Sequence, residues 1–308
     1  MKYRSSCPLC HSRESVPFLV GQDMETLQPG DFTIGRCQNC GFCYLSNIPD
    51  ENEIVKFYPP DYGAYNLSVG LEESLYSKLL GVFLNHGVAS YFDIPILKPF
   101  GNGKMLDIGS GSGYLLKMYK EAGWDITGVD FSDLAVDRAN AMLGDAYCGK
   151  GNAERPGFNP ESFSLITASQ VLEHLENPLE TLLNWKKLLR NDGWIIVAVP
   201  NFMSLNRRLF GKWWYGGLSL PRHFNHFSAE TLSYILAKCS FHTQSIKCVP
   251  FPSFANSLML KFGKTYREVN SSYPIRLLNA LTIFQETILS KFSLSDGLLA
   301  VAYKGEKR

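Results

Sequence analysis

Apolar runs of strand length alternate with amphipathic helical stretches from about residue 103 onward. Helical periodicity begins at Tyr114, after Ser132 and over residues 178–189. Strands that alternate with helices indicate an α/β fold, in which helices cover both faces of a mainly parallel sheet. Ligands of such sheets bind beyond the carboxyl ends of the strands. The predicted strands are residues 104–108, 124–129, 163–168, 193–199, 243–249 and 297–303.

Two long segments interrupt this pattern. Residues 201–228 are too long for an ordinary strand-to-helix connection, and long connections are usually functional. Residues 251–295 separate the last two predicted strands, and apolar spacing over residues 275–292 indicates a helical insertion. We favour a cap packed on the sheet edge or on a partner subunit, which leaves a homodimer open. A lid, or a membrane-surface helix for a lipid-linked substrate, is disfavoured because few basic residues interleave.

The first hundred residues follow a different pattern. Residues 16–20 and 32–34 are strand-like and are expected to pair as a hairpin. Prolines punctuate the connector that follows, and residues 71–83 have helical spacing. The sequence therefore predicts a small module over residues 1–48, a linker with helices over 49–100, and a main domain over 101–308 that carries both insertions.

Five of the eight cysteines lie within the first 43 residues. Cys7 and Cys10 form one CxxC pair, and Cys37 and Cys40 form a second. Two thiolates on one tight turn can reach the same zinc ion at about 2.3 Å, and two facing turns complete a closed tetrahedral site. Such a site has no open coordination position. We therefore expect a structural zinc that supplies most of the folding energy of this small module.

Other interpretations of the cysteines are weaker. Four thiols without metal would leave the matched spacing unexplained, and a redox CxxC would explain only one pair. Cys43 is left over and is expected to be a buried thiol, and His11 is a remote alternative ligand.

Charge and hydropathy exclude several classes of protein. The chain has 30 basic and 29 acidic residues, a formal net charge of +1, which argues against a nucleic-acid binder that works by bulk electrostatics. No uncharged apolar run has the roughly 18 residues that a transmembrane helix needs. No apolar stretch follows the N-terminal basic residues, so a secretory signal is not expected and a cytoplasmic location is.

A glycine-rich loop directly follows the strand at residues 104–108. Gly109, Gly111 and Gly113 are spaced Gly-x-Gly-x-Gly, and Tyr114 occupies the sixth position, where a dinucleotide fingerprint has Gly or Ala. Asp107 lies two residues before the first glycine, where its carboxylate would repel a pyrophosphate and suits a cationic group. S-Adenosylmethionine has an α-ammonium and a sulfonium but no phosphate, so it fits better than a nicotinamide dinucleotide.

A second acidic residue supports this choice. Asp130 ends the second predicted strand, where a carboxylate can accept hydrogen bonds from both ribose hydroxyls. Phe131 beside it is expected to cover the adenine. The alternative is that Asp107 is an ordinary polar strand end and Asp130 a helix cap.

These motifs resemble those of a known family. Residues 105–113 (MLDIGSGSG) resemble motif I of class I S-adenosylmethionine-dependent methyltransferases, and residues 128–132 (GVDFS) resemble their second-strand acidic motif. Residues 164–174 (SLITASQVLEH) look like their fourth strand and following loop, and 194–200 like their fifth. With the cysteine pairs and PRHFNHFSAETL, the chain is similar to bacterial methyltransferases that carry an N-terminal zinc-binding module. Some of those act on sugars or belong to polysaccharide or secondary-metabolite pathways.

The resemblance implies a Rossmann-like, mostly parallel seven-stranded sheet with S-adenosylmethionine as cofactor. Where the family often has an acidic residue against the adenine, this chain has Asn152, which can still accept a hydrogen bond from the adenine amino group. The cofactor-binding residues that follow from the motifs are Asp107, Gly109, Ser110, Gly111, Gly113, Asp130, Phe131, Asn152, Ala153, Ser169 and Gln170.

Methyl transfer to a weakly acidic nucleophile needs a base within hydrogen-bond reach. His223 and His226, in the long segment after the fifth strand, are the best candidates, and His174 is expected in a wall of the active site. The alternative is that one of these histidines packs against the helix after Ser228 and merely fixes the loop. A metal held by His223 and His226 is disfavoured because no clear carboxylate partner lies nearby.

The sequence therefore predicts a methyltransferase that acts on a small polar metabolite, such as a sugar or a sugar nucleotide. The residues do not decide between O-, N- and C-methylation. The competing hypothesis is a non-catalytic protein that binds S-adenosylmethionine or assists assembly.

Overall fold

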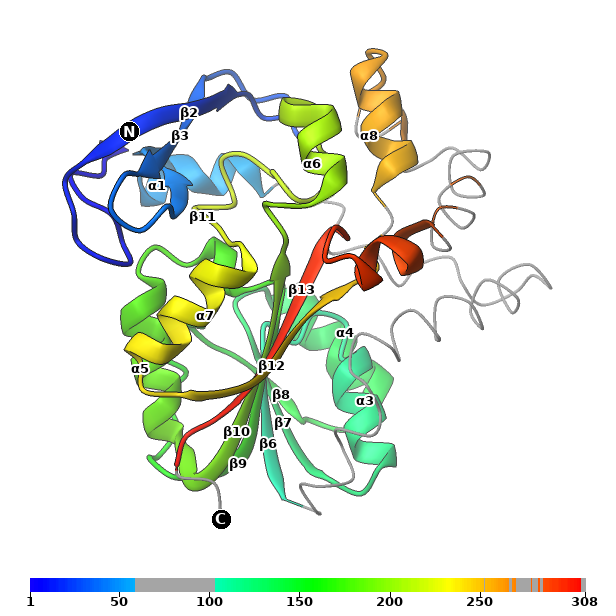
Figure 1. Ribbon diagram of the computed structural model, residues 1–308. Helices are drawn as coiled ribbons and strands as arrows, with labels where there is room; N and C mark the ends of the chain where they lie inside the picture. Colours follow the sequence, from blue (N-terminus) through cyan, green and yellow to red (C-terminus); the bar gives the residue numbers. More distant parts are fainter. Residues whose placement is uncertain are drawn as a thin grey trace. The chain divides into compact units, whose positions relative to one another are not determined.

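The computed structural model describes residues 1–58, 103–251, 253–265, 268, 269, 278, 282 and 285–305 (Figure 1). The chain divides into two compact units, each made of separate stretches of sequence. The helix predicted over residues 71–83, and most of the linker around it, lie outside the described residues. The first unit comprises Met1–Tyr62, Val199–Leu232 and Lys247–Leu298, and the second comprises Gly63–Ala198, Ser233–Ile246 and Leu299–Arg308.

A seven-stranded sheet with the order β12-β13-β10-β9-β6-β7-β8 forms the centre of the second unit. The five strands from β10 to β8 are parallel. β13 is antiparallel to β10, because the backbone N–H of Lys304 donates to Gly193 while that of Asn201 donates to Asp296. The strands are β6 (Lys104–Ile108), β7 (Asp125–Asp130), β8 (Cys148–Lys150), β9 (Phe163–Ser169), β10 (Leu189–Pro200), β12 (His242–Val249) and β13 (Gly297–Tyr303).

Helices cover both faces of this sheet, with α3 and α4 on one face and α5 and α7 on the other (Figure 1). The central strands are accordingly apolar along nearly their whole length, as in β9, where Phe163, Leu165 and Ile166 are fully buried. The predicted Rossmann-like fold is confirmed. The helices are α3 (Tyr114–Glu121), α4 (Asp133–Leu143), the 3₁₀ turn η5 (Leu172–His174), α5 (Pro178–Leu188) and α7 (Ala229–Lys238).

The first unit contains a four-stranded sheet with the order β11-β4-β3-β2. β2 and β3 pair antiparallel, so the predicted hairpin is confirmed. β11 comes from the long segment after β10 and pairs with β4, with Asn225 opposite Tyr44 and His226 opposite Cys43. The strands are β2 (Ser15–Gly21), β3 (Phe32–Cys37), β4 (Cys43–Leu45) and β11 (Asn225–His226), beside a separate pair of β1 (Lys2–Tyr3) and β5 (Asn47–Ile48).

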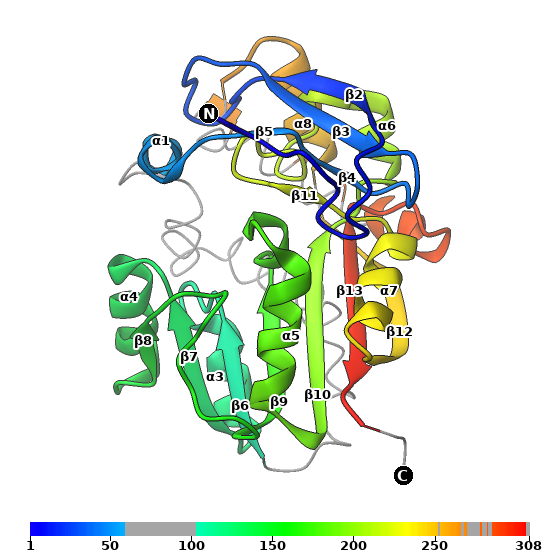
Figure 2. The same cartoon turned by 90° about the vertical axis from the view of Figure 1, so that its left-hand side faces the viewer.

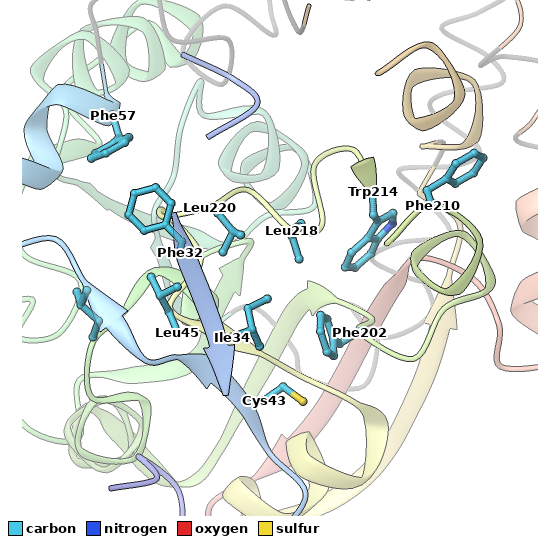
Figure 3. Close-up of a cluster of buried hydrophobic side chains, with 11 residues drawn as sticks. Phe32, Ile34, Cys43, Leu45, Phe57, Phe202, Phe210, Trp214, Leu218 and Leu220 are labelled. Carbon is cyan, nitrogen blue, oxygen red and sulfur yellow. The ribbon is translucent and has the colours of Figure 1, made fainter. Parts of the chain in front are cut away.

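One hydrophobic core holds the first unit together (Figure 3). Phe32 and Ile34 of the N-terminal hairpin pack in it with Phe202, Trp214 and Leu218 from the segment after β10. Burial of each such side chain contributes about 1.5–3 kcal/mol, so both stretches gain stability from the core that they share. The predicted boundaries at residues 48 and 100 stay a prediction, but in space residues 1–48 and 201–228 share this core. The helices are α1 (Glu51–Ile54), η1 (Val55–Phe57), α6 (Leu205–Phe210), η6 (Gly211–Trp213) and α8 (Phe254–Lys261).

The predicted helical insertion at residues 251–295 lies partly outside the described residues. Its described part begins with α8 and rejoins the sheet at β13. No helix in the part of the chain that the structure describes is long and apolar enough to cross a membrane.

Candidate functional site

Polar side chains gather at the carboxyl ends of four adjacent parallel strands of the second unit. Figure 2 shows the arrowheads of β7, β6, β9 and β10 at the same edge of the sheet. Asp107 is the penultimate residue of β6, Asp130 ends β7, Asn152 follows β8, and Ser169 ends β9. Because β9, β6, β7 and β8 are neighbours, the predicted cofactor residues meet at one edge of the sheet.

The three glycines of the loop after β6 all have positive φ, 71° for Gly109, 51° for Gly111 and 79° for Gly113. A Cβ on Gly109 would collide with Val171, and one on Gly113 would lie 2.9 Å from Cα of Ala139. At Gly111 the same Cβ would meet no described atom within 4 Å. The backbone there borders open space, so a ligand can approach Gly111 closely.

The Asp130 carboxylate is held by backbone donors. Its Oδ2 accepts a hydrogen bond from the N–H of Gly111 at 2.9 Å, and its Oδ1 accepts one from the N–H of Ser132 at 3.0 Å. Each carboxylate oxygen has two lone pairs, so both can accept a further bond from a ribose hydroxyl. The same contacts tie the glycine loop to the end of β7.

Asp107 is buried, and Thr167 Oγ1 donates to its Oδ1 at 2.6 Å. Burial raises the pKa of Asp107 to about 7; the hydrogen bond from Thr167 opposes this rise, and the nearby charge of Asp130 adds to it. A cation placed beside this carboxylate would favour its charged form. Asp107 is therefore suited to the α-ammonium of S-adenosylmethionine.

Two other predicted residues use their polar groups within the protein. Ser110 Oγ lies 2.9 Å from Cys148 Sγ on β8, so the Ser110 side chain faces the neighbouring strand. The carbonyl of Ala153 accepts a hydrogen bond from Nε1 of Trp185 at 2.7 Å. The backbone N–H of Ser110 is also engaged, because it donates to the carbonyl of Val129 at 3.2 Å.

The adenine end of the predicted site is less complete. Asn152 Oδ1 accepts a hydrogen bond from the N–H of Glu154 at 2.7 Å, which forms an Asx turn. The predicted acceptor for the adenine amino group is thus partly used by the local backbone. Phe131 is 58% exposed, and a large apolar side chain so exposed next to Asp130 is available to cover a ligand.

Two side chains after β9 carry buried polar atoms that have no hydrogen-bond partner within the described ranges. They are Nε2 of Gln170, which was predicted, and both carboxylate oxygens of Glu173, which was not. Burial raises the pKa of Glu173 to about 8. In the sequence Glu173 is one polar residue beside another, His174, and periodicity gives no indication that it is buried. Unpartnered Gln170, the open space at Gly111 and the two aspartates together fit S-adenosylmethionine.

The four paired cysteines come together in the first unit. Their sulfur atoms all lie within 4.8 Å of one another, with Cys7 Sγ 3.6 Å from Cys40 Sγ and Cys10 Sγ 3.5 Å from Cys37 Sγ. A tetrahedral zinc with bonds of about 2.3 Å needs sulfur atoms about 3.8 Å apart. The donor set therefore fits one zinc ion with little adjustment.

The two CxxC turns have the same backbone structure. The N–H of Cys7 donates to Ser12 and the N–H of His11 donates to Cys7, just as that of Cys37 donates to Phe42 and that of Gly41 donates to Cys37. His11 and Gly41 occupy equivalent positions, both with positive φ, 61° and 72°. His11 is thus the turn residue of its loop and lies outside the four-cysteine cluster. The remaining thiol, Cys43, is buried on β4.

The three predicted histidines are distributed between the units. His223 and His226 belong to the first, with ring centres 6.5 Å apart, while His174 lies half-buried in η5 of the second. His223 Nδ1 lies 3.0 Å from the carbonyl oxygen of Gly217. Since a carbonyl can only accept, Nδ1 carries a proton.

His226 has a different environment. Its ring is fully buried in β11, 4.9 Å from that of Phe202, and its Nε2 has no hydrogen-bond partner in the described part of the chain. Burial lowers the pKa of His226 to about 3, helped by the charges of Arg207 and Arg4. The imidazole is therefore neutral at physiological pH and a weak base.

Comparison with known proteins decides the family. A family model described as a methyltransferase domain matches residues 84–245, more than half of the chain. The chain belongs to this methyltransferase family. The predicted methyltransferase domain is thereby confirmed.

Relatives and solved structures agree with this assignment. The methyltransferase is 30% identical over 109 residues to a ubiquinone biosynthesis O-methyltransferase of Photobacterium profundum, a match that covers 34% of this chain and 44% of the relative. A counterpart from Schizosaccharomyces pombe is 30% identical over 117 residues, covering 36% and 42%. The methyltransferase thus spans less than half the length of these curated relatives.

Solved structures share the fold. A proposed methyltransferase from Bacillus halodurans has a TM-score of 0.51 at 16% identity and covers 71% of this chain and 98% of its own. A proposed sarcosine dimethylglycine methyltransferase from Galdieria sulphuraria has a TM-score of 0.52 at 12% identity, covering 73% and 87%. At these identities the likeness concerns the fold alone.

Proposed function

We propose that this methyltransferase transfers a methyl group from S-adenosylmethionine to a hydroxyl oxygen of a small polar metabolite, with a sugar or sugar nucleotide as the acceptor class. The observation that carries the cofactor assignment is that Asp130 accepts a hydrogen bond from Gly111, a glycine with open space at its Cβ position. The O-methyltransferase relatives favour oxygen as the acceptor atom. The proposal of a sugar as the methyl acceptor rests on the sequence resemblance to methyltransferases that carry an N-terminal zinc-binding module.

The cofactor, when bound, supplies an electrophilic methyl group on a sulfonium. In our proposal Asp130 accepts hydrogen bonds from the ribose, and Asp107 lies against the α-ammonium. The backbone at Gly111 and Gly113 approaches the methionine portion. Holding these groups fixes the direction of the methyl group, and alignment with the nucleophile is the main contribution an enzyme makes to an in-line displacement.

His223 is the proposed general base. The Gly217 carbonyl keeps a proton on Nδ1, so Nε2 is the nitrogen that would take up the proton of a hydroxyl when the ring is neutral. His226 is assigned a packing role instead, because a buried imidazole with a pKa of about 3 takes up a proton poorly. His174 is proposed to line the acceptor pocket.

The four cysteines are proposed to hold one structural zinc ion. Cys7, Cys10, Cys37 and Cys40 would fill all four tetrahedral positions, which leaves none for a substrate or a water. The zinc would then stabilise the first unit and take no direct part in the transfer.

Calorimetric titration with S-adenosylmethionine tests the cofactor site. Asp130→Ala removes two charge-assisted hydrogen bonds within the loop and the ribose acceptor, so we expect about a ten- to hundredfold loss of affinity. Asp133→Ala is the matched control, because Asp133 is an exposed aspartate three positions away that pairs only with exposed Lys150. Equal affinity in wild type and Asp130→Ala would contradict the site.

A further inference from the structure

We propose that Arg222 is a positioning residue. Through it, the N-terminal part of the chain (residues 1–58) holds residues 217–227 in place. These residues carry His223, so the proposal rests on the proposed function only where it concerns the role of that histidine. The first unit supplies every contact used below.

The Arg222 guanidinium is completely buried and is held by residues from the start of the chain. Its Nη2 donates to Asp23 Oδ1 at 2.7 Å and lies 3.3 Å from Glu25 Oε1, and its Nη1 donates to the carbonyl of Phe57 at 2.9 Å. Glu25 also accepts a hydrogen bond from the hydroxyl of Ser219. An arginine from the segment after β10 thus depends on three acceptors that precede residue 58.

Asp23 is itself fixed by the turn between β2 and β3. Its carboxylate accepts hydrogen bonds from the backbone N–H groups of Glu25 at 3.0 Å, Thr26 at 3.2 Å and Gln28 at 3.2 Å. Burial alone would raise the pKa of Asp23, but the charge of Arg222 and these hydrogen bonds hold it below its ordinary value. Both partners are therefore charged, and Asp23→Asn would leave Arg222 with Glu25 as its remaining carboxylate neighbour among the described residues.

A second attachment lies at the other side of His223. β11 pairs with β4, the N–H of Leu45 donates to the carbonyl of Phe224 at 2.9 Å, and the rings of Phe42 and Phe227 lie 5.2 Å apart. Residues 42–45 begin two positions after Cys40 of the four-cysteine cluster. His223 therefore lies between two attachments, one to the hairpin turn and one to the strand that leaves the cysteine cluster.

Hydrogen exchange and histidine NMR on the full, zinc-loaded chain test the proposal. In Asp23→Asn we expect the amides of residues 217–227 to exchange at least tenfold faster, and the ¹³C-labelled imidazole signal of His223 to shift. Peptides of residues 104–130 should be unchanged. Asp31→Asn is the matched control: the same substitution at the end of the same turn, where the exposed carboxylate of Asp31 accepts a hydrogen bond from Nε2 of Gln22. Unchanged exchange of residues 217–227 in Asp23→Asn would overturn the proposal.

A double variant separates positioning from stability. Asp23→Asn with Arg222→Met also removes the buried guanidinium that has lost one of its two carboxylate partners, so the melting temperature should recover relative to Asp23→Asn alone. We expect residues 217–227 to keep exchanging fast and the His223 signal to stay displaced, because the attachment is still missing. Recovery of both would mean that Arg222 acts through stability alone and would overturn the proposal. Failure of S-adenosylmethionine to bind would contradict the proposed function and leave these outcomes unaffected.

Discussion

Asp107 of the second unit and Asp23 of the first are both buried, and their pKa values are shifted in opposite directions. In the second unit, burial raises the pKa of Asp107 to about 7, although the Thr167 hydroxyl donates a hydrogen bond to it. In the first unit, the buried Arg222 holds the pKa of Asp23 below its ordinary value. The Asp23 carboxylate, which is paired with a buried cation, therefore stabilises the fold. The Asp107 carboxylate, which accepts a hydrogen bond from a neutral hydroxyl, is suited to a ligand that brings a cation.

The units also differ in how sequence becomes structure. The cofactor edge of the second unit is built from short motifs, each at the end of one strand, that the sheet places side by side. The first unit is built from three stretches that are far apart in the chain and share one core. Loss of one stretch should therefore disturb the others in the first unit, which is the basis of the largest predicted effect.

Cys37→Ser is expected to unfold the first unit as a whole. Structural zinc sites contribute about 10–16 kcal/mol of apparent binding free energy, more than most domains have as net stability. Wild type should contain about one zinc per chain and the variant none. Hydrogen exchange should show lost protection over residues 32–45 and also over 202–227, with residues 104–130 still protected.

Cys248→Ser is the control for that experiment, because Cys248 lies in the first unit but outside the four-cysteine cluster. Full zinc in Cys37→Ser would contradict the metal site. Loss of protection confined to residues 1–48 would show instead that the module folds by itself, and would restore the boundaries predicted from sequence.

The next effect concerns two histidines that are close in sequence within the first unit. His223→Gln should lower kcat by about 10²- to 10⁴-fold if His223 is the base, with unchanged affinity for S-adenosylmethionine. His226→Leu should change kcat only a few-fold, because the buried neutral ring of His226 packs against Phe202. Formation of S-adenosylhomocysteine over a panel of sugars and sugar nucleotides is the measurement. Equal losses of kcat in the two variants would remove the distinction between base and packing residue.

The sequence was sufficient to predict the sheet and the strand ends at which the candidate site lies. β6 and β13 have the predicted bounds, and Asp107, Gly111 and Asp130 lie together as expected. The signals are local: an apolar run, glycines at the turn, a carboxylate at a strand end. The CxxC pairs are equally local, and their cysteines form a cluster.

Contacts between distant stretches could not be predicted in this way. Arg222 was one polar residue in PRHFNHF, and nothing near it indicated that Asp23 would neutralise it in the interior. β11 is only two residues long, too short to show strand periodicity, so its pairing with β4 was missed. The role of Asn152 in a local Asx turn also depends on the fold of the chain after β8.

The smallest effect tests the unpaired aspartate directly, through pH. Below its pKa of about 7, Asp107 is protonated and gives the α-ammonium of S-adenosylmethionine no charge to bind; above it, the carboxylate is charged. Affinity should therefore rise about tenfold from pH 6 to pH 8 and then level off. In Asp107→Asn the side chain cannot titrate, so affinity should be weak and flat across the same range. Calorimetry at pH 6, 7 and 8 measures both slopes. An equal slope in the variant would assign the titration to another group, and Asp107 would then resemble Asp23 in serving the fold and not the ligand.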